Sequence, residues 1–282
     1  MRASIFVLLF IVILFFSSSW LPEFGIWNGL EKIREAEVRI LEEPAREMLT
    51  PPPLRTDKES PSSLLTRSGV IVWTNRERRN AGLTALSENQ ELNAAAAAKV
   101  SDMFAKQYFD HVSPTGIAAA DLAAGAGYDY IAIGENLALG NFADDKELVE
   151  AWMASPGHRA NILKSSYGEI GVAVKRGTFE GRVTWLAVQI FGRPRSSCPA
   201  LNESLKEKVN ANQTRLRQLE SDLEQLKIEI GSTRPRRGPE YSQKVEAYNA
   251  LVNDYNALAA ETRTSVETYN NQVRLFNQCA VK

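Results

Sequence analysis

Two apolar seams in the last third of the chain leave few possible structures for that region. In each seam the positions advance in steps of three and four, which is the heptad pattern of packed helices. The first consists of Leu205, Val209, Asn212, Leu216, Leu219, Leu223, Leu226 and Ile230, and the second of Tyr241, Val245, Tyr248, Val252, Tyr255, Ala259, Thr262, Val266, Tyr269, Val273 and Phe276. Residues 231–239 between them hold two prolines and two glycines, which stop one helix and start another. The pattern predicts an antiparallel α-helical hairpin, a coiled coil, over residues 198–282.

The only two cysteines of the chain lie at the two ends of this predicted hairpin. Cys198 opens the first arm and Cys279 closes the second. In an exported chain such a pair is expected to form a disulfide, so we predict a bridge between Cys198 and Cys279. An intermolecular bridge in a coiled-coil oligomer and two unrelated free thiols are the alternatives.

An apolar run at the N-terminus predicts that the chain is exported or anchored. Residues 5–21 are apolar apart from three serines, and the run is close to the ~20 residues that a membrane-spanning helix needs. The serines before Trp20 are small enough to flank a cleavage site, so a signal peptide is one interpretation. We favour a transmembrane anchor over residues 1–22, because Trp20 and Trp27 suit the membrane interface and Arg2 favours an outward-facing C-terminal part.

Two polar segments separate the anchor from the first folded domain, and together they cover residues 23–64. Residues 30–49 are rich in Glu and Arg with scattered aliphatic residues, so we expect an exposed stalk helix. The sequence Thr-Pro-Pro-Pro that follows ends any helix, and residues 50–64 are predicted to be a semi-rigid, proline-rich linker.

Residues 65–195 have the patterning of a separate domain. Helical patterning covers residues 65–80 and 90–106, whereas short β-branched segments at 169–174 and 182–191 predict an antiparallel hairpin, with a further strand at 128–133. Helices followed by a hairpin, without βαβ alternation, predict an α+β layered domain that can bury its own core.

The charge of the chain is balanced, which excludes one class of partner. Lys and Arg number 33 and Asp and Glu number 34, so the formal net charge is -1. No overall positive field is available to hold a polyanion, and we expect no nucleic-acid partner.

The chain has only two histidines, and each lies in a dense local motif. The motifs, in order, are Asn75–Arg78, Tyr108–His111, Gly134–Ala138, Trp152–Met153 with Ser155–Leu163, and Ile170–Val172 followed by Gln189–Gly192. This ordered succession, over roughly 67–192, resembles the bacterial, SCP-like branch of the CAP superfamily (cysteine-rich secretory proteins, antigen 5 and pathogenesis-related proteins). The resemblance implies an α-β-α sandwich and an extracellular location.

The resemblance also implies a ligand-binding cleft lined by two histidines and acidic residues, which match His111, Glu135 and His158. The second acid that is typical of animal and plant members falls on Ser155, so this chain departs from the pattern. Glu150 would lie roughly 140° around the helix axis from Ser155 and does not replace that acid. Sequence spacing alone does not show that these three side chains converge on one site. In the alternative interpretation, Glu135 accepts hydrogen bonds from backbone amides at a turn and the histidines link loops.

The residues around His158 predict its charge state. Ser155 and Pro156 suit the N-cap and first position of a helix, which places His158 in the first turn, where the positive helix end favours neutral imidazole. Two imidazoles and one carboxylate, His111, His158 and Glu135, could hold a divalent metal such as zinc with water in an open position. Asp110 is a candidate to orient a histidine, or alternatively faces solvent.

No motif of nucleophilic catalysis is present, and no catalytic residue is assigned. We therefore expect a membrane-anchored, extracytoplasmic protein that binds a small polar, lipid or cell-envelope ligand, with an envelope glycan, lipid or protein as partner. It would be secreted if the N-terminal segment is cleaved. Two alternatives remain open, a divalent-metal-dependent hydrolase that uses the same cleft, and a structural envelope spacer or protein-interaction module. The sequence leaves the ligand, the metal and the oligomeric state undefined.

Overall fold

The computed structural model describes residues 39–58, 60 and 62–281, which divide into two units. The larger unit extends over Leu41–Asn202 and resumes at Tyr269, and the smaller unit includes Glu203–Thr268. The predicted anchor or signal peptide at residues 1–22 lies outside the described residues. Among the helices that are described, none combines the length and apolar character needed to cross a membrane.

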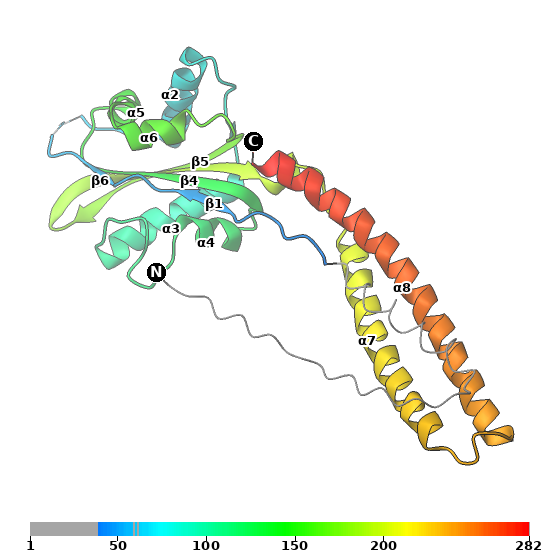
Figure 1. Cartoon of the computed structure of the whole chain (residues 1–282). Helices are drawn as coiled ribbons and strands as arrows, with labels where there is room; N and C mark the ends of the chain where they lie inside the picture. Colours follow the sequence, from blue (N-terminus) through cyan, green and yellow to red (C-terminus); the bar gives the residue numbers. More distant parts are fainter. Residues whose placement is uncertain (1–38, 59, 61, 282) are drawn as a thin grey trace, which may run out of the picture. The chain divides into compact units, whose positions relative to one another are not determined.

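A mixed six-stranded sheet forms the middle of the larger unit (Figure 1). Its strands are β1 (Glu47–Leu49), β2 (Leu54–Arg55), β3 (Ser87–Glu88), β4 (Tyr130–Leu139), β5 (Glu169–Phe179) and β6 (Arg182–Pro194). The order is β1-β4-β6-β5-β3, with β2 also paired to β4. Strands β4, β6 and β5 are antiparallel to one another, whereas the short strands β1, β2 and β3 pair in parallel. The predicted hairpin is confirmed, and the predicted strand at 128–133 extends to Leu139.

Helices cover both faces of this sheet (Figure 1). Helices α2 (Arg67–Asn80), α5 (Asp145–Ala154) and α6 (Pro156–Ile162) lie on one face, and α3 (Gln90–Lys106) and α4 (Ala119–Gly125) lie on the other. Successive residues of a strand point to opposite faces, so β4 contributes Ile133 and Leu137 to the core beneath α3, and Ala132 and Ala138 to the core on the α2 side. This mixed α/β arrangement is the predicted fold of the domain.

Side-chain caps start the two predicted helices. Thr66 Oγ1 accepts a hydrogen bond from the backbone N–H of Gly69 at the start of α2, and Asn89 Oδ1 accepts one from Leu92 at the start of α3. Helix α3 then packs directly on β5, because a Cβ at Gly171 would lie only 2.2 Å from the backbone carbon of Leu92. Both helix predictions are confirmed.

The segment before the domain differs from the predicted stalk helix and linker. Within the described residues 39–49 there is no helix, and Pro44 explains why, since proline in a helix interior breaks the hydrogen-bond pattern. Strands β1 and β2 instead pair with β4, and Thr56 N–H donates to Leu139 O at 3.0 Å. We call residues 47–56 the strap, because they run along the outer edge of β4.

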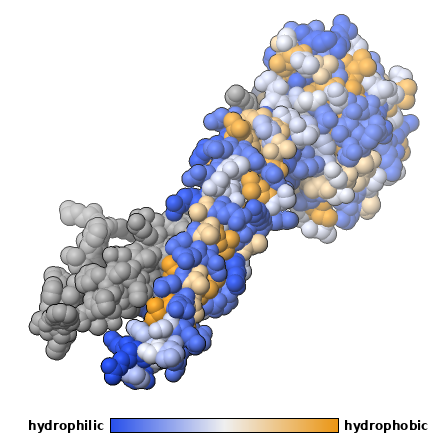
Figure 2. Space-filling view, turned by 90° about the vertical axis from the view of Figure 1, so that its right-hand side faces the viewer, coloured by the Kyte–Doolittle hydropathy of each residue, from blue (hydrophilic) through white to orange (hydrophobic). Residues whose placement is uncertain are grey.

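Two long helices carry the heptad seams. Helix α7 spans Glu203–Ser232 and α8 spans Pro239–Ala280, with its last residues assigned to the larger unit. Lys208 pairs with Glu261 at 2.7 Å and Tyr255 donates to Glu220 at 2.7 Å, so the helices run antiparallel. Their buried apolar cluster consists of Leu216, Leu219, Leu223, Tyr248, Tyr255 and Ala259. On the face shown in Figure 2 the helical region is mostly hydrophilic, with scattered hydrophobic residues.

The disulfide joins the end of α8 to the segment that follows β6. Cys198 comes directly after a short 3-10 helix, η2 (Arg195–Ser197), and bonds to Cys279 with a Cα–Cα distance of 5.7 Å. The Arg193 guanidinium donates to the carbonyl oxygens of Cys279 and Ala280 at 2.8 and 3.0 Å. The predicted bridge is therefore present and is intramolecular.

Candidate functional site

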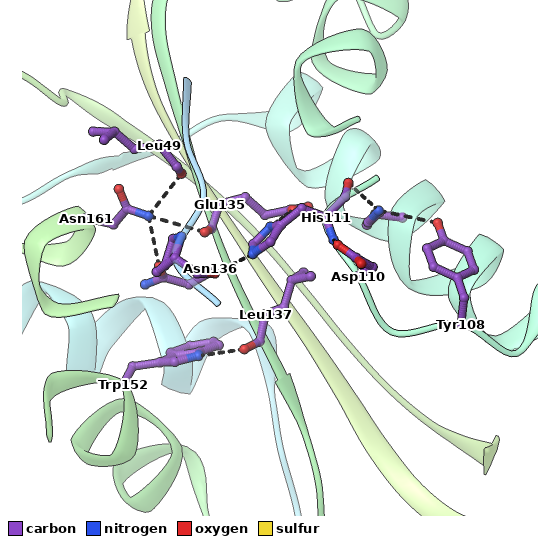
Figure 3. Close-up of polar contacts among 11 residues, drawn as sticks. Leu49, Tyr108, Asp110, His111, Glu135, Asn136, Leu137, Trp152 and Asn161 are labelled. Atoms are coloured by element: carbon purple, nitrogen blue, oxygen red, sulfur yellow. Dashed lines mark hydrogen bonds and ion pairs between the residues drawn. The ribbon is translucent and has the colours of Figure 1, made fainter. Parts of the chain in front are cut away.

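The centre of the candidate site is a buried pair formed by His111 and Glu135 at the outer edge of the sheet (Figure 3). His111 lies in the loop after α3, and its Nδ1 is 2.6 Å from Glu135 Oε2. Its other ring nitrogen, Nε2, contacts the carbonyl oxygen of Pro51 in the strap. The Pro51 carbonyl oxygen can only accept, so Nε2 donates in that contact, and Nδ1 shares a hydrogen with the Glu135 carboxyl group.

The backbone of His111 is fixed on both sides by charged groups. The fully buried Lys99 donates from Nζ to the His111 carbonyl oxygen at 2.7 Å, and burial lowers the pKa of Lys99. Asp110 Oδ1 accepts from the His111 backbone N–H at 2.6 Å, so Asp110 orients the main chain and not the ring. The sequence analysis missed Lys99, although a single lysine that ends a run of alanines is a visible signal.

Asn161 of α6 connects the strap to the opposite face of β4. Its Nδ2 lies 3.2 Å from Glu135 O, 3.0 Å from Asn136 Oδ1 and 3.2 Å from Leu49 O. Asn136 in turn donates to the His158 carbonyl oxygen at 3.2 Å. The resemblance includes both asparagines in its motifs, but the sequence predicted no role for them, and here they hold α6, β4 and the strap together.

His158 is buried in the first turn of α6. Ser155 is the N-cap and Pro156 follows it, as predicted, but Ser155 Oγ lies 2.8 Å from His158 Nδ1 and caps no backbone N–H. Burial, with a smaller effect from the charge of His111, lowers the pKa of His158 to about 4. This direction agrees with the predicted neutral state, with burial as the main cause.

Protonation of His158 is expected to destabilise the domain in acid. The unfolded chain binds this proton with the ordinary pKa of 6.5 and the folded chain only near 4, so the folded state holds fewer protons between these values. The stabilisation of the folded state by neutral His158 is fully present above pH 6.5. As the pH falls to about 4, the free energy of unfolding decreases by about 2 to 3 kcal/mol. The measurement is the free energy of unfolding against pH for wild type and His158→Gln. Curves that stay parallel over this range would contradict the assignment.

The structure brings two of the three predicted site residues into contact and separates the third. The Glu135 side chain shares the face of β4 that carries Ile133 and Leu137, whereas α6 with His158 covers the opposite face. The two halves meet at the edge of the strand, where Pro51 contacts His111 and also lies against Gly157.

The predicted open cleft and metal set are not formed in this arrangement. His111, Glu135 and His158 are 8%, 0% and 1% exposed, because the strap closes the edge above them. Over residues 39–58, 60 and 62–281 no three His, Cys, Asp or Glu side chains are grouped to hold a metal ion. Both ring nitrogens of His111 already have hydrogen-bond partners, so these residues do not fit the predicted zinc site.

Two further residues belong to helix α5, which lies near the site. Glu150 is exposed and pairs with Lys146 at 3.4 Å, which agrees with its rejection as a replacement acid. Trp152 is fully buried, and its Nε1 donates to Leu137 O at 3.2 Å, so it supports β4 from the core.

A sheet with helices on both faces and a buried polar pair at its edge defines a layered α/β domain. Residues 73–191 match the model of the Cysteine-rich secretory protein family, CAP. Residues 73–191 of this chain therefore form a CAP domain, as the motifs predicted.

Bacterial proteins are similar to this domain. The uncharacterized protein YkwD of Bacillus subtilis (strain 168) is 42% identical over 118 residues, which cover 42% of this chain and 46% of YkwD. The uncharacterized membrane protein YlbC of the same organism is 31% identical over 130 residues, which cover 46% of this chain and 37% of YlbC. An extracellular protein containing a SCP domain from Bacillus anthracis str. Ames is 27% identical in its crystal structure, with a TM-score of 0.40 and coverage of 45% and 40%. The chain thus spans less than half the length of the curated relatives that it matches.

Proposed function

We propose that this chain is a membrane-anchored, extracytoplasmic binding protein whose CAP domain takes a cell-envelope ligand at the edge of β4. The ligand would contact His111, Glu135 and His158, and the two long helices would act as a coiled-coil module of the same chain. A disulfide between Cys198 and Cys279 is consistent with the oxidising environment outside the cytoplasm.

One observation carries this proposal, namely that two of the buried polar atoms that lack a hydrogen-bond partner within the described residues belong to the predicted site residues. These atoms are Glu135 Oε1 and His158 Nε2. Buried polar groups are nearly always hydrogen-bonded, so unpaired atoms in two residues that flank β4 support a binding site for an external polar molecule. Both belong to residues that the family resemblance selects.

The chemistry of these atoms favours a ligand that both donates and accepts hydrogen bonds. Glu135 Oε1 can only accept while the carboxylate is ionised. Neutral His158 carries one ring hydrogen. If that hydrogen is on Nδ1 and is donated to Ser155 Oγ, Nε2 is an acceptor, and if Ser155 Oγ donates to Nδ1, Nε2 is a donor. Hydroxyl and amide groups, as in glycans and peptides, supply both, whereas a lipid tail supplies neither. No observation favours the metal-dependent hydrolase, because the donor set that it needs is not assembled.

Replacement of Glu135 by glutamine tests the site. We expect purified full-length protein to co-sediment with isolated cell-wall glycan, and Glu135→Gln to lower that affinity about tenfold through loss of a charged acceptor. Glu150→Gln is the matched control, because it makes the same change at an exposed position of the same domain. Phospholipid vesicles serve as the second binding material. Equal binding by all three proteins, or binding to neither material, would contradict the proposal.

A further inference from the structure

The strap passes directly over the candidate site. Strand β1 pairs with residues 132–134 of β4 and β2 pairs with residues 138–139. Residues 50–53, which include three consecutive prolines, therefore cross Glu135–Leu137 without ladder pairing. The part of the strap without ladder pairing thus lies beside the part of β4 that carries Glu135 and Asn136.

The domain contacts this part of the strap mainly through its backbone. The Leu49 carbonyl oxygen accepts from Asn161 Nδ2 at 3.2 Å, and the Pro51 carbonyl oxygen accepts from His111 Nε2. One side chain of the strap also packs closely against the domain. Pro51 is buried, and a Cβ placed on Gly157 would lie only 2.6 Å from Pro51 Cβ. Strands β1 and β2 pair with β4 on either side of this part, and side chains hold carbonyl oxygens between them. Recognition of a strand's backbone at a sheet edge, with one side chain in a fitted position, is how β-strand addition binds peptides.

The strap is an incomplete occupant of the site. It leaves Glu135 Oε1 and His158 Nε2 without partners, although both atoms are buried. Its three prolines also have no N–H with which to extend the ladder. A competing strand that supplied hydrogen bonds to these atoms would therefore gain contacts that the strap does not make.

We propose that the site binds an extended, proline-containing peptide strand parallel to β4, and that the strap is an intramolecular copy of this ligand that keeps the site closed. The inference rests on the proposed function and names its ligand class, a peptide segment of another envelope protein. A short tether gives the strap an effective concentration in the millimolar range, so an external peptide binds only weakly until the strap leaves.

The main test frees the site in the full-length chain. Residues 47–56 are replaced by ten glycine and serine residues, and binding of a fluorescent peptide with the sequence of residues 46–57 is followed by anisotropy. We expect at least tenfold tighter binding to the replaced chain than to wild type. Adding Gly157→Ala to the replaced chain should abolish the gain, because the new Cβ would lie only 2.6 Å from the position of Pro51 Cβ.

The outcomes separate this inference from the proposed function. A replaced chain that keeps its cooperative thermal unfolding but binds the peptide no more tightly than wild type would overturn the peptide assignment. If that chain still binds cell-wall glycan in a Glu135-dependent manner, the proposed function stands without the peptide class. If the replaced chain binds neither the peptide nor the glycan, both the peptide assignment and the proposed function are overturned.

A second measurement leaves the strap in place and does not depend on the replaced chain folding. Gly157→Ala favours helix α6 intrinsically but should push Pro51 off its site, exposing the backbone at Arg55 to trypsin. We expect cleavage after Arg55 to be at least tenfold faster than in wild type. Gly125→Ala is the matched control, because Gly125 also lies in a helix and a Cβ there meets no atom within 4 Å. Equal cleavage rates in both variants would overturn the view that Pro51 holds the strap on the site.

Discussion

Replacing Arg78 by methionine is expected to lower the free energy of unfolding of the CAP domain by about 4 kcal/mol. The guanidinium is 1% exposed and donates to the carbonyl oxygens of Thr84, Ile162, Lys164 and Tyr167, at 2.8 to 3.3 Å. Methionine fills much of the same volume but donates no hydrogen bond, so it leaves these carbonyls without their charged donor. Burial lowers the pKa of Arg78, which reflects the desolvation that these hydrogen bonds offset.

Arg79→Met is the control for this substitution, because the neighbouring Arg79 is exposed on the same helix. Urea unfolding followed by tryptophan fluorescence reports on the domain, since Trp73, Trp152 and Trp185 all lie within it. A loss of less than about 1 kcal/mol in Arg78→Met, or an equal loss in Arg79→Met, would show that the buried guanidinium is not a major anchor of these loops.

Removal of the disulfide, by Cys198→Ser with Cys279→Ser, is expected to lower the free energy of unfolding by about 4 kcal/mol. The bridge closes a long loop, with 81 residues of sequence separation, and the loss of such a cross-link increases the entropy of the unfolded chain. Non-covalent contacts hold the same segments, including the Arg193 hydrogen bonds and the Arg195 guanidinium 4.5 Å from the Phe276 ring centre. These contacts should preserve the native structure in the variant.

Guanidinium unfolding of wild type with and without a reducing agent provides the comparison. The reducing agent should shift the midpoint for wild type to that of the double variant and leave the double variant unchanged. A wild-type midpoint that does not respond to reduction would contradict the predicted contribution of the bridge.

Local patterns in the sequence predicted much of the domain. Helices α2 and α3 follow from apolar periodicity and capping residues, and the β5–β6 hairpin follows from β-branched segments around Gly181. Each of these features depends on residues that are close in sequence. The disulfide was equally accessible, because only one intramolecular pairing of two cysteines exists.

The strap could not be predicted from the same patterns. Strands of two and three residues are too short to show periodicity, and β1 pairs with a strand more than eighty residues later in the chain. Its prolines indicate an extended segment but not the surface on which that segment lies. Among residues 30–49, Pro44 is the one residue whose type argues against a stalk helix, because proline breaks a helix interior.

The sequence predicted only part of the candidate site, because the rest depends on contacts between segments that are distant in the chain. The resemblance identified His111 and Glu135, which the structure places in contact. The predicted strand ends at residue 133, so it does not include the alternation that turns Glu135 and Asn136 to opposite faces. The roles of Lys99 and Asn161 depend on backbone carbonyls from distant segments, which no residue type reveals in the sequence.

Departure of the strap would also change the outer boundary of the sheet. Strand β4 is buried along all ten of its residues, and without β1 and β2 it would become the last strand on that side. Unprotected strands of this length attract strands from neighbouring molecules. A molecule that has lost its strap to proteolysis would therefore tend to pair with a second copy, strand edge to strand edge.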